Sequence, residues 1–122
     1  MPWRRRPGRR AAPCAHTIHK HVVLPWKASG RLDVFVQTWN PELARAMQRF
    51  WSPAALDVAP QNSSLRCPFP LNLCVRTMWA LLGMKRGLNL RTQWARAGGH
   101  RHVTVLVMRH DVYWFSSLPP FL

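Results

Sequence analysis

The sequence predicts an α/β fold in which strands and helices alternate in the order β-α-β-α-β around a small parallel sheet. Residues 103–108 (VTVLVM) form an apolar, mostly β-branched run without polar alternation, as in a strand covered on both faces. Residues 32–51 show a strand–turn–helix pattern, and residues 71–97 show a second helical pattern. Alternation of this kind favours parallel strands joined by crossover helices.

Length and charge limit the classes of protein to consider. A chain of 122 residues and 48% hydrophobic content supports one domain with a core. Its formal net charge is +14, and five arginines lie in the first ten residues. The remainder still has 13 Lys and Arg against four acids, which favours polyanionic partners such as nucleic acid, anionic membrane or phosphorylated small molecules.

The N-terminal segment, residues 1–21, is predicted to be a disordered basic tail, and residues 22–122 the α/β domain. An organelle transit segment is the alternative for the tail, although three prolines oppose an amphipathic helix there. No apolar run reaches the roughly 18 residues of a membrane-spanning helix, and no secretory apolar region follows the basic residues. The three cysteines indicate neither a disulfide framework nor a zinc ribbon.

The first strand and helix meet at the clearest local signal in the chain. Residues 32–39 are rich in β-branched and aromatic side chains and predict a strand. Asn40 suits an N-cap, Pro41 the first helical position, and Glu42 the positive end of a helix. This helix is expected to continue to Trp51, before a Ser-Pro pair.

The second half of the chain repeats the alternation. Residues 55–59 predict a short strand, and apolar residues at helical spacing predict a helix over residues 71–97. Gly83 and Gly87 weaken the middle of that helix and are expected to divide it, while Gly98 and the following glycine end it.

The predicted strand at 103–108 is followed directly by Arg109, His110 and Asp111. Ligands of open α/β sheets bind beyond the carboxyl ends of the strands, so these side chains are candidate site residues. The alternative is a strand that leaves the core and reaches solvent, where charged side chains are common.

Two motifs in this order carry a resemblance to a family. Residues 33–43 (DVFVQTWNPEL) and 107–114 (VMRHDVYW) resemble the "DVF(V/I)HTWNPE" and "RxD" segments of a group of polysaccharide glycosyltransferases. The resemblance covers roughly Val22 to Leu118. It implies a Rossmann-like, three-layer domain of the GT-A type. Such a domain binds a nucleotide-diphosphate sugar donor and transfers the sugar to a hydroxyl of a glycan acceptor.

The resemblance also implies roles for four residues. Asp111 is expected to contact a divalent cation (Mn²⁺ or Mg²⁺) or the ribose. Arg109 is expected either to contact the donor phosphate or to orient the carboxylate. Trp39 and Asn40 are expected to border the same crevice. Full-length members of the family suggest either the cytoplasm or the secretory pathway. Because both stay open, the sequence does not decide the compartment.

The chain departs from the family in three ways. Its first strand is replaced by the basic segment, the residues that build the acceptor side are missing, and Gln37 stands where the family usually has His. A single carboxylate is also few for a divalent cation, which takes several oxygen ligands. We expect a partial domain, either inactive or truncated, rather than an intact enzyme.

A different class of function also fits the sequence. A small basic nucleic-acid-binding protein would account for the arginine-rich tail and for aromatic residues among cations, such as Trp94 near Arg91 and Arg96. A fragment without a function of its own is the third hypothesis.

Overall fold

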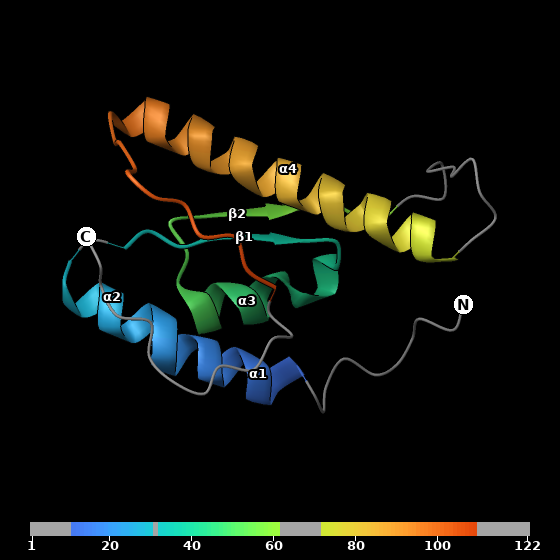
Figure 1. Ribbon diagram of the computed structural model, residues 1–122, viewed down its shortest axis with the longest axis horizontal. Coiled ribbons are helices and arrows are strands. Elements are labelled where there is room, and N and C mark those ends of the chain that lie inside the picture. Colours follow the sequence, from blue (N-terminus) through green and yellow to red (C-terminus); the bar gives the residue numbers. More distant parts are fainter. Residues whose placement is uncertain (1–10, 31, 62–71, 110–122) are drawn as a thin grey trace. The chain divides into compact units, whose positions relative to one another are not determined.

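The computed structural model describes residues 11–30, 32–61 and 72–109 of the chain (Figure 1). They belong to two compact units. One unit is Val34–Val105, and the other contains the chain before Val34 and after Val105.

The sheet of the Val34–Val105 unit has two strands, β1 (Phe35–Thr38) and β2 (Ala55–Val58). They are parallel, and Phe35 pairs with Ala55 at the start of the register. Two further hydrogen bonds, donated by the N–H groups of Ala54 (2.7 Å) and Ala59 (3.1 Å), extend the pairing at both ends. The prediction of two parallel strands around the first helix is confirmed.

The connection between the strands turns at Asn40 and Pro41 as predicted, but the Asn40 side chain makes no capping hydrogen bond and the α-helix starts only at Ala44. Asn40 is extended (φ −114°, ψ 93°) and its carbonyl accepts a hydrogen bond of 3.0 Å from the N–H of Leu43. A 3₁₀ turn, η2 (Pro41–Leu43), leads into helix α3 (Ala44–Trp51). The helix ends at Ser52, which adopts the left-handed conformation at φ 44° before a proline that disfavours the helical region.

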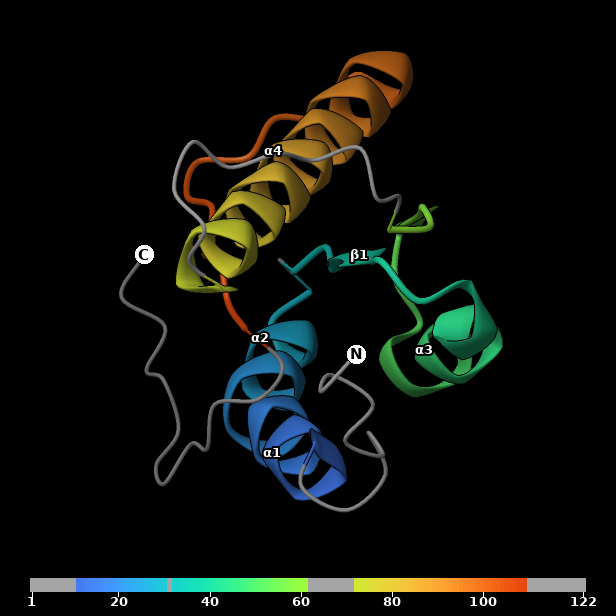
Figure 2. The same cartoon turned by 90° about the vertical axis from the view of Figure 1, so that its right-hand side faces the viewer.

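Helix α4 (Asn72–Gly98) packs on one face of the sheet and α3 on the opposite face (Figures 1 and 2). The expected division of this helix at its interior glycines is wrong, because α4 is continuous through both. A Cβ atom at Gly83 would lie 2.8 Å from Oε1 of Gln37, and one at Gly87 would lie 3.8 Å from Cβ of Gln37. Glycine therefore lets the backbone of α4 approach the side chains of β1 closely.

The third predicted strand is absent from residues 103–109. These residues have no strand pairing, and Val103 is 84% exposed, with Leu106 at 55%. The boundary between the two compact units falls within this run, after Val105. Apolar β-branched residues favour a strand only where a neighbouring strand and covering side chains are present, so the pattern alone was insufficient.

The predicted disordered tail is wrong over residues 11–21. The chain is helical from α1 (Ala11–Ile18) through a π-helical turn (His19–Val23) to α2 (Leu24–Ala28). Proline is tolerated in a first turn, because the N–H groups there have no partner within the helix. Pro13 occupies such a place, and the widened π turn ends at Val23, two residues before Pro25, which cannot donate a helical hydrogen bond.

The coarse fold is thus a small two-stranded parallel sheet with helices. The finer Rossmann-like arrangement stays a prediction, and residues 1–10 of the predicted tail lie outside the described residues.

No helix within the described ranges is long and apolar enough to cross a membrane. Cys74 is disulfide-bonded, whereas Cys14 is free.

Candidate functional site

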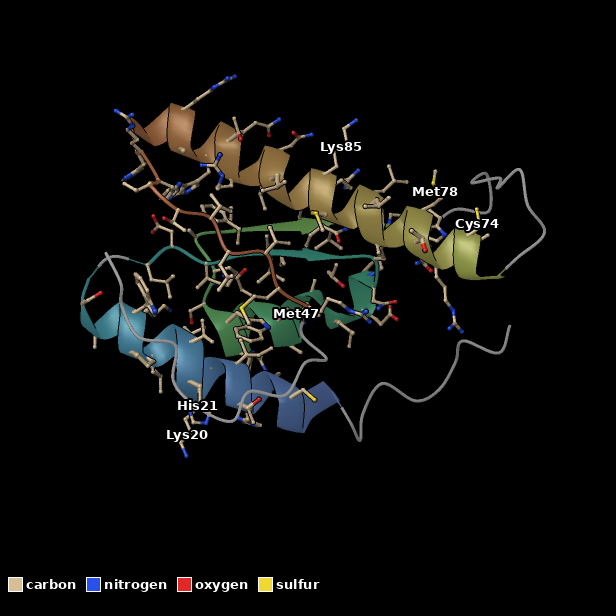
Figure 3. All side chains as sticks on the ribbon, in the orientation of Figure 1. Lys20, His21, Met47, Cys74, Met78 and Lys85 are labelled. Carbon is tan, nitrogen blue, oxygen red and sulfur yellow. The ribbon has the colours of Figure 1, made fainter. Side chains whose placement is uncertain are left out.

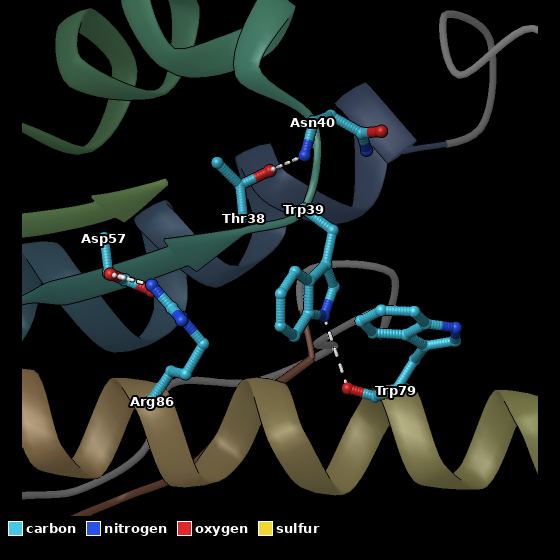
Figure 4. Close-up of polar contacts among 6 residues, drawn as sticks. All are labelled: Thr38, Trp39, Asn40, Asp57, Trp79 and Arg86. Atoms are coloured by element: carbon cyan, nitrogen blue, oxygen red, sulfur yellow. Dashed lines mark hydrogen bonds and ion pairs between the residues drawn. The ribbon is translucent and has the colours of Figure 1, made fainter. Parts of the chain in front are cut away.

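Trp39 follows β1 and lies against α4 (Figure 4). Its indole N–H donates a 3.3 Å hydrogen bond to the backbone carbonyl of Trp79, and the two rings meet edge to face at 4.8 Å between centroids. The guanidinium of Arg86 lies 5.7 Å from the centroid of the Trp39 ring, within the range of a cation–π interaction. The polar N–H of Trp39 is therefore used inside the protein.

Arg86 links the helix to the second strand. It donates two hydrogen bonds, of 2.6 and 2.9 Å, to the carboxylate of Asp57 in β2 (Figure 4). The hydrogen bond and charge of Asp57 raise the pKa of Arg86 above its ordinary value, although the Arg86 side chain is 44% exposed. Water screens an ion pair that is so exposed. The main effect of the pair is therefore to orient Arg86 against the sheet.

The remaining predicted site residues are not brought together by the described part of the chain. Asn40 is exposed, its backbone N–H donates to Oγ1 of Thr38 at 3.1 Å, and its side-chain amide points away from Trp39 (Figure 4). Arg109 is exposed and belongs to the other compact unit, and Asp111 lies outside the described residues. The nucleotide-sugar site stays a prediction.

A second cluster surrounds Trp94 near the carboxyl end of α4. Phe35 of β1 meets the Trp94 ring edge to face at 5.3 Å between centroids. The imidazole of His100 stacks on Trp94, with 4.4 Å between ring centroids and an interplanar angle of 12°. His102 is also near parallel to Trp94, at 6.0 Å and 22°. Trp94 thus joins the sheet to the segment that follows the helix.

Arg91 supports the same cluster from one helical turn earlier. Its Nη1 lies 3.2 Å from Nδ1 of His102, and its Nη2 donates to Oγ1 of Thr92 at 3.3 Å. The edge of His102 also faces Phe35, at 5.7 Å between centroids. The cluster is therefore fixed by contacts with β1 and with α4 itself.

The described residues offer little for a divalent cation. None of the ranges that the structure describes contains a group of three or more His, Cys, Asp or Glu side chains able to hold a metal ion.

The sequence pattern indicated Trp94 and Arg91 but not His100. A signal for it exists: a helix that ends in a glycine often brings the residue after that glycine back onto the last turn. Trp94 and His100 stand at such positions around Gly99. The two glycines were predicted to end the helix, but the position of the residue that follows them was not predicted.

The comparisons with known proteins add no relative. No family model matches this sequence, and no curated protein or solved structure matches it significantly. The glycosyltransferase resemblance therefore rests on its two short motifs alone.

Proposed function

We propose that this chain is a small basic protein that binds nucleic acid, and that helix α4 contributes much of the electrostatic attraction. The observation that carries the proposal is the composition of this helix. Its 27 residues include five Lys and Arg and no carboxylate. A cationic helix of this length attracts a phosphate backbone and gains free energy by releasing condensed counterions.

The cations of α4 differ in how they are used. Arg86 is paired with Asp57, and Arg91 is engaged with His102. Lys85 and Arg96 are exposed, and neither has a salt bridge within the described residues. Figure 3 shows the Lys85 side chain pointing away from the strands. These two side chains are available to phosphate oxygens.

Nucleic acid fits this surface better than a small phosphorylated ligand does. The five cations are distributed along the 27 residues of α4. A polymer binds charges spread along a surface, whereas a small ligand binds charges gathered around one point. Arg101, also exposed, continues the positive charge beyond the end of the helix. Aromatic rings lie among these cations, as in proteins that bind single strands.

The test measures binding of a labelled mixed-sequence RNA by fluorescence anisotropy between 50 and 200 mM salt. Affinity is expected to fall linearly on a log–log plot. The double variant with Lys85→Gln and Arg96→Gln should lose about 0.7 of the slope per removed phosphate contact. Glutamine retains the helix propensity, so the fold is kept.

The matched control is Lys27→Gln, which removes one exposed cation from the other compact unit. It should leave the contribution of α4 intact. Absence of salt-dependent binding by the unaltered chain would overturn the proposed function. An unchanged slope in the double variant would exclude α4 as the binding element.

Sugar transfer is the second candidate. The observation in its favour is that β1 and β2 are parallel, so their carboxyl ends share one edge, where Trp39 and Asn40 follow β1. A Mn²⁺-dependent thermal shift with UDP- or GDP-sugars, lost in Asp111→Ala, would support it. No shift with any of these donors would count against sugar transfer.

A further inference from the structure

We propose that His100 is a stacking platform for one unpaired base, so that the nucleic acid bound by this chain is single-stranded. This inference rests on the proposed function, because it names the class of nucleic acid that would occupy the same cationic region. Its origin is the geometry at the carboxyl end of α4.

The last turn of α4 closes with two characteristic hydrogen bonds. The N–H of His100 donates to the carbonyl of Ala95 at 2.8 Å, and the N–H of Gly99 donates to the carbonyl of Arg96 at 3.4 Å. Gly99 is left-handed, with φ +67°. These are the bonds of a Schellman motif, which turns the chain back over the final helical turn. The backbone therefore fixes the position of His100.

The turn lays the imidazole of His100 on the indole of Trp94, at 4.4 Å and 12°. Space for it exists because residue 98 is a glycine: a Cβ atom there would lie 2.5 Å from Cδ2 and 2.8 Å from Nε2 of His100. Trp94 is held in turn by Phe35 of the sheet. The imidazole is consequently ordered before any ligand arrives.

One face of this ring is covered, yet the residue remains exposed. Trp94 is partly buried and covers one side of the imidazole, while His100 as a whole is exposed. Histidine rings are among those on which proteins stack unpaired bases. A ring that is already oriented loses little side-chain entropy when a base is added to the stack.

Positive charge lies next to the platform in the chain. Arg96 is in the last turn of α4 and Arg101 follows His100 directly, and both are exposed. A base on His100 places its own phosphates near this segment. Stacking combined with such cations is typical of sequence-tolerant binding to single strands. A duplex keeps its bases stacked on one another, so it offers no free face to His100.

A Schellman motif often includes a contact between the positions of Trp94 and His100, so the stack alone has a structural explanation. The experiment must therefore separate helix capping from base binding. We would use the full chain with three labelled ligands of equal length: an oligouridine strand, an abasic strand and a duplex RNA.

His100→Ala should weaken binding of the oligouridine about tenfold, as expected for the loss of one stacked base. Affinity for the abasic strand and the duplex, and the salt slope, should not change. His100→Tyr keeps a ring that can stack and should restore the affinity. Gly98→Ala should cause the same selective loss as His100→Ala, since the new Cβ displaces an otherwise intact imidazole.

The outcomes distinguish the two proposals. Salt-dependent binding by the unaltered chain, with equal affinity for all four proteins towards oligouridine, would overturn the stacking role and leave the proposed function standing. Equal losses on the abasic strand in His100→Ala would also overturn it, because they would show a general structural effect. No binding of any ligand by the unaltered chain would overturn both.

Discussion

Helix α4 and the residue that follows it contain two pairs of glycines with opposite roles. Gly83 and Gly87 lie in its interior and face Gln37 of β1, whereas Gly98 and Gly99 lie at its end, beside His100. The interior pair keeps helical geometry and allows another side chain to approach the backbone. The terminal pair provides a left-handed residue and space for the next ring. Glycine in a helical pattern therefore indicates either a close approach or an end, and neighbouring residues decide between them.

The largest effect is expected from removing the ring beside the interior pair. Trp39→Ala deletes the indole that contacts Trp79 and Arg86, and should lower the free energy of unfolding by about 3 kcal/mol. Chemical denaturation measures it. Trp39→Phe keeps most of the ring and loses one hydrogen bond, so its cost should be only about 1 kcal/mol. Equal costs for both variants would contradict the packing role of the ring.

Substitution of the two interior glycines by alanine should change the free energy of unfolding in opposite directions. Gly87→Ala places its Cβ in ordinary contact and should raise the free energy of unfolding by about 0.8 kcal/mol through helix propensity. Gly83→Ala meets Gln37 at 2.8 Å and Nε1 of Trp39 at 3.2 Å, and should lower it by about 1 kcal/mol.

The same pair of variants offers a sharper check by double-mutant cycle. In the Trp39→Ala background, Gly83→Ala should lose part of its destabilising effect, since the contact with Trp39 is gone while the closer contact with Gln37 remains. If both Gly83→Ala and Gly87→Ala stabilised the otherwise unaltered chain, α4 and β1 would not be in close contact at these glycines.

At the terminal pair, Gly99→Ala should cost about 1 kcal/mol, because an alanine at φ +67° is strained. Thermal unfolding measures the change. Gly98→Ala is the matched control: its backbone is helical, so alanine should cost little stability while displacing His100. A larger loss of stability from Gly98→Ala than from Gly99→Ala would contradict the assignment of the strained backbone to residue 99.

The smallest effect is expected at the ion pair beside the interior pair. Asp57→Asn removes the carboxylate that holds Arg86, in an exposed pair that salt screens. Stability should change less than in any variant above, while Arg86 becomes available to phosphate. RNA affinity at low salt should rise slightly, with a slope steeper by at most about 0.7. A weaker affinity would mean that Asp57 positions Arg86 for binding.

Much of the fold could be predicted because its signals are local. Asn40 and Pro41 mark the start of a helix through backbone conformation alone, and the glycines at 98 and 99 mark an end. The strands at 35–38 and 55–58 are short but lie between clear turn residues. Such signals depend on a few neighbouring residues, so they survive without knowledge of the tertiary contacts.

The two failures have different physical causes. The run that begins at Val103 has strand propensity but no strand partner among the described residues, and such a partner depends on what lies nearby in space, which composition and periodicity do not encode. The contact of Trp94 with His100 is local, but it is made through a turn rather than through a periodic pattern. The candidate site was therefore predicted only in part, through Trp94, Arg91 and Arg96.

A sheet of only two strands leaves one side of each strand's backbone without a neighbour among the residues described. Unpaired edges of this kind can pair with the same edge of another copy of the protein. The strongly positive charge of the chain opposes this pairing, because the copies repel one another. Raising the ionic strength weakens that repulsion along with any attraction for RNA. Concentrated salt should therefore release the nucleic acid and promote self-association together, which light scattering would detect during the same titration.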